Sequence, residues 1–397
     1  NPTPLNANTL PLNCTLPMPV NAPPSVVLVN PATGSFLEAK AADDFEGTAC
    51  PLLDAAFKRE HQVYWGLSRR NDPSPFGLGL TVLAAADSLR NGSKAACWHR
   101  YARLELVQDD AGAWAYREGG LQRRTVGGMG ELAGGTGVTY EPLIRELRKR
   151  GYRLGEYDEA KGEASGDLFG VPYDWRLDLA EHAVDDSPVS GGTFSRLKAL
   201  LEAAAAAKGG ARSRVVSHSM GAPFFHAFLH GYVSRDWAER HVEMHISLEG
   251  AWAGSPKATG IVVSGVGVQE EEAGQMALGR AQGFLFHALQ AQLAAELIQP
   301  AVSSWGALFA GLGPAAEVPH GENPTLATLR GRAYGPADME RLYDDLGMPH
   351  GAAIIRRNLR FLGGFRAPPV STHCFYGTGL PTPRSWRFAA AAVGGGW

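Results

Sequence analysis

Apolar and polar positions change their spacing several times along this chain. Residues 25–29 contain a continuous apolar run, which is typical of a strand buried on both faces of a parallel sheet. Residues 141–148 instead place apolar side chains at helical spacing, with a proline near the start and Gly151 beyond the end, and predict a helix. Because such patterns alternate, we expect an α/β fold with a doubly wound, mostly parallel sheet.

Further elements follow the same two patterns. Strands are predicted at 214–217, 242–248 and 372–376, and residues 169–176 end another strand in a turn. Helices are predicted at 194–208, which is rich in alanine, and at 222–229, which is apolar enough to be buried against a sheet.

Three segments interrupt the alternation. Residues 1–24 are rich in proline and asparagine and predict an irregular leader ahead of one domain at 25–397. Residues 41–104 lose clear periodicity and are interpreted as an inserted lid that covers the site. Residues 255–365, between two predicted strands, are interpreted as a cap insertion.

Composition narrows the classes of function. The chain has 397 residues, 45% of them hydrophobic, and a formal net charge of −3, so it is globular and gives no reason to expect a nucleic-acid partner. Apolar runs stay below the roughly 18 residues that a membrane span needs, so any membrane contact is expected to be peripheral. The chain starts at Asn1 without a basic and apolar leader, and we expect a processed or truncated start.

Glycosylation sequons and cysteines favour the secretory pathway, with a vacuolar, lysosomal or extracellular destination. Sequons begin at Asn13 and Asn91, and both fit a compartment where glycans are added. Four cysteines can pair in three ways, and the sequence does not choose between them: Cys14, Cys50, Cys97 and Cys374.

A serine stands where the predicted strand at 214–217 breaks into the helix at 222–229. Ser219 has a small residue two positions before it, Ser217, and another two positions after it, Gly221. This spacing is typical of a nucleophile elbow, because the strained turn leaves little room for side chains. A plain serine at a helix start is the alternative. In an elbow, the amide of Met220 and the helix dipole would face a developing oxyanion.

Ester chemistry requires a second oxyanion donor from the loop after the first central strand. Residues 30–34 form that loop, and its proline and glycine allow the backbone to turn with an amide available. Ala32 is the candidate donor. An ordinary turn between strand and loop is the alternative.

Five separated segments together resemble the lecithin:cholesterol acyltransferase family, and in particular its lysosomal phospholipase A branch. They are 27–40, 172–176, 217–221, 247–254 and 373–383. The resemblance implies an α/β-hydrolase core with a serine nucleophile, a lid closed by a disulfide between Cys50 and Cys97, and a cap between late strands. It also implies that Trp65 in the lid contacts lipid, although simple packing explains a tryptophan there equally well.

The resemblance also implies a catalytic aspartate and a later histidine beyond the segment that ends at Pro383. The fourteen residues that follow contain neither residue type, so we expect a chain truncated at its C-terminus. Replacement by other groups would require a rebuilt triad, so truncation is the simpler interpretation. The later candidates are His320, His350, His373, Asp338, Asp344 and Asp345.

The expected function is therefore that of an O-acyltransferase or phospholipase. Ser219 would form an acyl-enzyme from a phospholipid at a membrane or lipoprotein surface, and water or an alcohol would accept the acyl group. A catalytically incomplete lipid-binding remnant is the alternative. We expect neither cofactor nor metal, because the glycine-rich segment 128–133 lacks a following long helix and the segment 241–245 has strand spacing rather than that of a zinc helix.

Overall fold

A computed structural model describes most of the predicted core. The described residues are 23–32, 34–41, 62–65, 103–110, 112–117, 121–132, 135–264, 299–310, 324–362, 366–379 and 384–388. Cys50 and Cys97, which are predicted to close a lid, lie outside them, as do the candidate base His320 and most of the predicted leader. Only the backbone of Trp65 is described.

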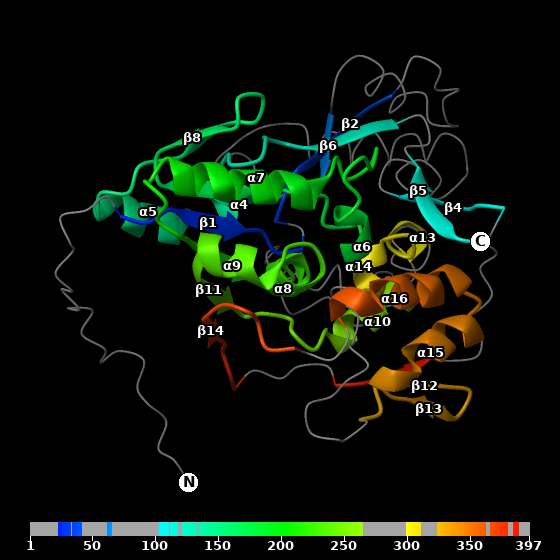
Figure 1. The fold of residues 1–397 in the computed structure, drawn as a ribbon. Coiled ribbons are helices and arrows are strands. Elements are labelled where there is room, and N and C mark those ends of the chain that lie inside the picture. Colours follow the sequence, from blue (N-terminus) through cyan, green and yellow to red (C-terminus); the bar gives the residue numbers. More distant parts are fainter. Residues whose placement is uncertain are drawn as a thin grey trace, which may run out of the picture.

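The centre of the fold is a five-stranded sheet in which every neighbouring pair of strands is parallel (Figure 1). The strand order is β14-β11-β10-β1-β9, so the chain winds from β1 to β9 in one direction and from β10 to β14 in the other. The predicted doubly wound α/β fold is confirmed. The bounds are β1 Val26–Val29, β9 Leu168–Val171, β10 Ser213–His218, β11 Val242–Leu248 and β14 Thr372–Phe375.

Strand β1 is buried on both faces, as its uninterrupted apolar sequence predicts. Val27 and Val29 belong to the larger core cluster, which contains side chains of helices α7 and α8. Val26 and Leu28 point the other way, into a smaller cluster with side chains of helix α5. These helices are α5 Glu141–Lys149, α7 Thr193–Ala206 and α8 Gly221–Gly231.

Smaller sheets and short helices are inserted between β1 and β10. One sheet has the order β3-β2-β6, and two hairpins pair β4 with β5 and β7 with β8. The strands are β2 Leu37–Ala41, β3 Gln62–Trp65, β4 Glu105–Gln108, β5 Trp114–Arg117, β6 Leu121–Thr125, β7 Glu156–Asp158 and β8 Glu163–Ser165. The helices are α4 Gly135–Thr139 and α6 Leu179–His182, and α9 Arg235–His241 follows β10 and α8.

The segment between β11 and β14 builds a helical layer at one end of the molecule, seen in yellow and orange in Figure 1. Helix α16 of this layer packs against α8, α14 and α15. Its described elements are α10 Pro256–Ser264, α13 Gln299–Val302, α14 Gly306–Phe309, β12 Ala327–Leu329, β13 Arg332–Tyr334, η3 Pro336–Asp338, α15 Met339–Asp345 and α16 Pro349–Leu362. Strand β15 Trp386–Phe388 pairs with β12.

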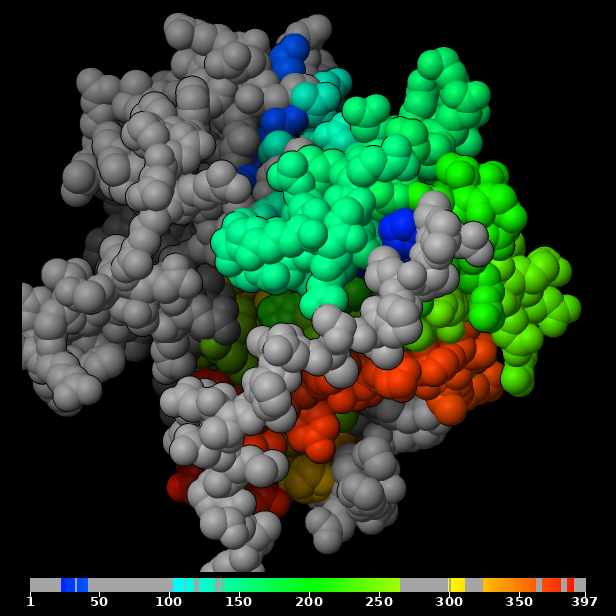
Figure 2. All heavy atoms as spheres, turned by 90° about the vertical axis from the view of Figure 1, so that its left-hand side faces the viewer, coloured from blue at the N-terminus to red at the C-terminus, as the bar shows by residue number. Residues whose placement is uncertain are grey.

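Strand β14 lies at one edge of the central sheet, and residues 366–379 form a continuous orange-red strip on the face shown in Figure 2. At its end, Phe375 is 59% exposed and Tyr376 is 75% exposed. In the described part of the chain, no helix combines the length and the apolar character that crossing a bilayer requires.

Candidate active site

The backbone turns sharply at Ser219. Strand β10 ends at His218 and helix α8 begins at Gly221, so only Ser219 and Met220 separate them. Ser219 has a φ of 51°, in the left-handed region that side-chain-bearing residues rarely adopt. The kink lies at the carboxyl end of β10 beside β1, where the winding direction of the sheet reverses and ligands of α/β folds bind.

Close packing explains why the residues two positions on either side of Ser219 are small. A Cβ atom on Gly221 would lie 2.6 Å from the carbonyl oxygen of Asn30 and 2.7 Å from that of Val29. Helix α8 therefore starts directly against the end of β1, and only glycine fits there. Ser217 is fully buried.

Neighbouring strands fix the turn through its backbone. The Ser219 amide donates to the Leu248 carbonyl at 3.0 Å, and the Ala251 amide donates to the Ser219 carbonyl at 3.2 Å. The side chain is half-buried, and within the described residues its Oγ has no hydrogen-bond partner. The hydroxyl therefore stands at a rigid corner with its donor and acceptor capacity unused by the described part of the protein.

The loop that holds Ala32 is anchored by the side chain of Asn30. This side chain is fully buried, and its Nδ2 donates to the Gly34 carbonyl at 3.2 Å, to Ser35 Oγ at 3.0 Å and to Thr136 Oγ1 at 2.8 Å. The Gly34 amide closes a turn onto the Pro31 carbonyl at 3.1 Å. Ala32 is half-buried in this turn, two residues after Asn30, whose carbonyl lies against the start of α8.

Two tyrosine hydroxyls from outside the sheet donate hydrogen bonds to backbone carbonyls at the end of β1. Tyr140 Oη donates to the Val29 carbonyl at 2.5 Å, and Tyr173 Oη donates to the Asn30 carbonyl at 2.8 Å. Burial raises the pKa of both phenols, so both remain donors at neutral pH. The loop geometry therefore depends on residues more than 100 positions away in the sequence.

Asp174 and Arg176 form an ion pair in the turn after β9. Arg176 Nε donates to Asp174 Oδ1 at 2.8 Å, and its Nη2 contacts the other carboxylate oxygen. Burial opposes ionisation of Asp174, but the guanidinium outweighs it and holds the pKa of the carboxyl below its usual value. The pair fixes the turn after β9, and Trp175 of this turn donates its Nε1 to the Ser35 carbonyl at 3.1 Å.

A histidine that the sequence analysis did not select lies directly behind the turn. Ser217 Oγ and His245 Nε2 are 2.7 Å apart, and both side chains are fully buried. Burial, with a smaller contribution from nearby His226, lowers the pKa of His245 to about 3. The imidazole is therefore neutral and connects β10 to β11 next to the candidate nucleophile. A histidine within a predicted strand of the core was the available sequence signal.

The candidate replacements for an acid and a base have other partners. His350 Nε2 lies 2.9 Å from the Ser303 carbonyl, and Asp345 accepts a hydrogen bond from Tyr334 at 2.6 Å. His373 is exposed on β14, 3.5 Å from Ser371 Oγ. Within the described residues, no histidine is hydrogen-bonded to Ser219. Cys374 is exposed and unpaired there.

The described residues contain no group of three or more His, Cys, Asp or Glu side chains that could hold a metal ion. The segment that superficially resembles a zinc helix joins α9 to β11, and most of it is strand.

Comparison with known proteins finds similarity to one family. The family model described as lecithin:cholesterol acyltransferase matches residues 97–277, a range that includes the turn after β9 and the Ser219 kink. The predicted resemblance to this family is confirmed. Lysosomal phospholipase A and acyltransferase of Rattus norvegicus is 24% identical over 383 residues, which cover 94% of this chain and 76% of that protein.

Two further relatives are similar to a shorter part of this chain. Lysosomal phospholipase A and acyltransferase of Homo sapiens is 25% identical over 254 residues, which cover 64% of this chain and 51% of that protein. Phosphatidylcholine-sterol acyltransferase of Oryctolagus cuniculus is 26% identical over 246 residues, which cover 62% of this chain and 46% of that protein. In both matches the aligned chain spans about half the length of the relative.

Proposed function

We propose that this chain carries the nucleophile of a phospholipid acyl ester hydrolase or O-acyltransferase, and that Ser219 is that nucleophile. The observation that carries the proposal is the left-handed backbone of Ser219, with a φ of 51°, between a buried strand and a helix at the carboxyl edge of the sheet. An elbow of this kind presents a hydroxyl to an ester while the following amide faces the carbonyl oxygen. The names of the relatives support the same substrate class.

The proposed reaction passes through an acyl-enzyme. Ser219 Oγ forms a bond to the ester carbonyl carbon, and the negative charge on the carbonyl oxygen is stabilised by the amides of Met220 and Ala32. Collapse of this intermediate breaks the bond to the glycerol oxygen, which takes up the proton that Ser219 Oγ has lost and leaves as a lysophospholipid alcohol. Water or another alcohol then takes the acyl group by the reverse sequence.

Lipid access is proposed to occur at a membrane or lipoprotein surface in the secretory pathway. Trp65 and a lid closed by Cys50 and Cys97 would form the contact with lipid. The short strand β3, which ends at Trp65, pairs with β2 just beyond the Ala32 loop, and this pairing supports a lid near the site.

Reaction with a fluorophosphonate probe tests the nucleophile. We expect covalent labelling of the unaltered chain, its loss in Ser219→Ala, and its retention in Ser371→Ala, which removes an exposed serine of the same protein. Labelling of Ser219→Ala equal to that of the unaltered chain would overturn the assignment.

A second candidate is a lipid-binding protein without ester turnover. It is favoured by one observation: Ser219 Oγ has no hydrogen-bonded base among the described residues, and a serine without a base is a poor nucleophile. This candidate predicts binding to phosphatidylcholine vesicles without release of fatty acid. Measurable release that depends on Ser219 would exclude it.

A further inference from the structure

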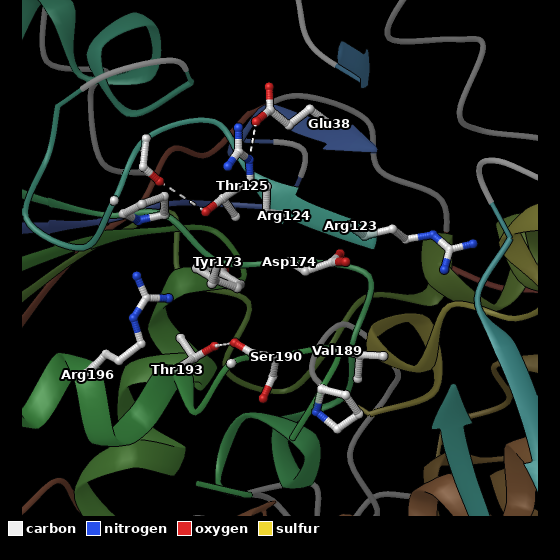
Figure 3. Close-up of a pocket in the computed structure, with 15 residues that line it drawn as sticks. Glu38, Arg123, Arg124, Thr125, Tyr173, Asp174, Val189, Ser190, Thr193 and Arg196 are labelled. Atoms are coloured by element: carbon white, nitrogen blue, oxygen red, sulfur yellow. Dashed lines mark hydrogen bonds and ion pairs between the residues drawn. The ribbon is translucent and has the colours of Figure 1, made fainter. Parts of the chain in front are cut away.

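A polar cavity of about 430 Å³ opens beside the candidate active site (Figure 3). It lies between β6, the turn after β9, and the loop that leads into α7. Its volume is within the range of small-molecule sites. None of its lining residues belongs to the reaction proposed for Ser219.

The position of the cavity relates it to Ser219. Its lining includes Tyr173, whose hydroxyl donates to the Asn30 carbonyl at 2.8 Å. That same carbonyl oxygen lies against Gly221, two residues after the candidate nucleophile. In the sheet, β9 and β10 are separated by one strand, β1, which places their carboxyl ends about 10 Å apart at the usual strand spacing.

The charge of the cavity favours an anion. Three arginines line it, Arg123, Arg124 and Arg196, against the two carboxylates of Glu38 and Asp174. Asp174 is already paired with Arg176, which is 1% exposed, so this carboxylate repels an anion less than a free one would. The lining itself therefore contains more cationic than acidic side chains.

Arg196 offers donors that its ion pair leaves unused. Its Nε and Nη2 bind the carboxylate of Glu159 at 2.8 and 2.6 Å. Its Nη1 lies 4.0 Å from the position of a Cβ on Gly191, in the cavity wall, and makes no hydrogen bond within the described residues. Glu159 fixes the guanidinium plane, so Nη1 is held in place for a ligand oxygen.

Arg124 approaches the same space from the opposite side. Figure 3 shows it on β6, whereas Arg196 rises from α7 across the cavity. Arg124 Nε binds Glu38, and within the described residues its two terminal nitrogens make no hydrogen bond. Both arginines line the cavity with donors to spare, and guanidinium donors suit the acceptor oxygens of a phosphoryl group.

We propose that this cavity binds the phosphodiester of the glycerophospholipid whose acyl ester reaches Ser219. The proposal rests on the proposed function, because the glycerol backbone must bridge the cavity and the serine. Arg196 and Arg124 hold the phosphate, and the headgroup beyond it extends towards solvent. Phosphate recognition at this distance selects phospholipids over neutral glycerides, which carry the same esters.

Binding to a soluble headgroup tests the site without requiring turnover. Titration calorimetry with sn-glycero-3-phosphocholine is performed on Ser219→Ala, so the result does not depend on the nucleophile. Arg196→Gln is expected to weaken binding at least tenfold, because it removes a charge-assisted contact. Arg145→Gln is the matched control: Arg145 is also paired with a glutamate, at 2.8 Å, but lies exposed on α5 outside the cavity. This control is expected to bind as tightly as the parent.

Each outcome decides the proposal. Absence of heat with the parent, or equal affinity of the Arg196→Gln and Arg145→Gln variants, would overturn it. Inorganic phosphate that binds more tightly than glycerophosphocholine would overturn the lipid assignment in favour of free phosphate. Should Arg196→Gln fail to fold, Arg124→Gln replaces it, since that side chain is 62% exposed. Failure of fluorophosphonate labelling would instead overturn the role of Ser219 and leave headgroup binding measurable.

Discussion

The buried imidazole of His245 predicts that this fold loses stability in mild acid. Burial, with a contribution from His226, lowers its pKa from 6.5 to about 3. The folded protein therefore keeps the ring neutral in mild acid, while the unfolded chain takes up a proton as the pH falls through 6.5. The contribution of this group to stability is complete above that pH and is lost progressively as the pH falls towards 3.

The size of the loss follows from the pKa of the unfolded chain. Protonation of one free imidazole lowers the free energy of the unfolded state by about 1.4 kcal/mol more at pH 5.5 than at pH 7.5. The folded state gains nothing in this interval, because its pKa lies well below 5.5. His245 alone should therefore reduce the free energy of unfolding by about 1.4 kcal/mol.

Urea unfolding followed by circular dichroism at the two pH values measures this contribution. His245→Gln removes the titrating ring and keeps an amide that can bond Ser217 Oγ, which lies 2.7 Å from the ring in the structure. We expect the difference in unfolding free energy between the two pH values to shrink by about 1.4 kcal/mol in this variant.

Phe225→Leu is the matched control for this experiment. The ring of Phe225 lies 5.0 Å from that of His245. Replacing it with leucine weakens core packing but removes no titrating group. The control should lose the same stability at both pH values. A pH difference in His245→Gln equal to that of the unaltered protein would refute the reasoning. Should that variant not fold, His182→Gln provides the same test, since burial lowers the pKa of His182 to about 4.

Three further substitutions test the scaffold of the site. Gly221→Ala should abolish fluorophosphonate labelling of Ser219, because its Cβ would lie 2.6 Å from the Asn30 carbonyl oxygen; labelling at the parental rate would contradict this packing. Asn30→Ala should lower the free energy of unfolding, measured in urea, by about 1–3 kcal/mol through loss of three buried hydrogen bonds, and a loss near zero would show that they contribute nothing. Asp178→Asn should cost about 3 kcal/mol in the same assay, because this fully buried carboxylate pairs with Arg357 at 2.7 Å; retention of parental stability would argue against that pair.

The sequence predicted the central sheet because burial on both faces leaves a local signal. The uninterrupted apolar residues of β1 and the alternating apolar residues of β11, at 242–248, were recognisable from neighbouring residues alone. The accessory strand β6 was not predicted. Its sequence contains two arginines and a glutamine, and four of its five positions are at least partly exposed, so its pattern does not differ from that of a loop.

The candidate nucleophile was predictable for the same local reason, whereas its supports were not. The residues that define the Ser219 turn all lie within five positions of one another. Asn30, by contrast, is held by Thr136, and Ser217 by His245, through contacts that only the folded chain creates. The cavity beside the site is a further example, since Arg124 and Arg196 meet from separate elements. Polar side chains in buried strands are the signal that would have indicated such contacts.

The strand order of the central sheet determines how long β1 remains unpaired during translation. Val26 of β1 is matched with Leu168 on one side and with Arg214 on the other, so both neighbours of this strand are translated more than 140 residues after it. At typical elongation speeds, strand β1 therefore remains without a partner strand for several seconds while the ribosome continues translation. An apolar strand exposed for that time is prone to aggregate, so we expect chaperones that shield the N-terminal part during translation to raise the yield of folded protein.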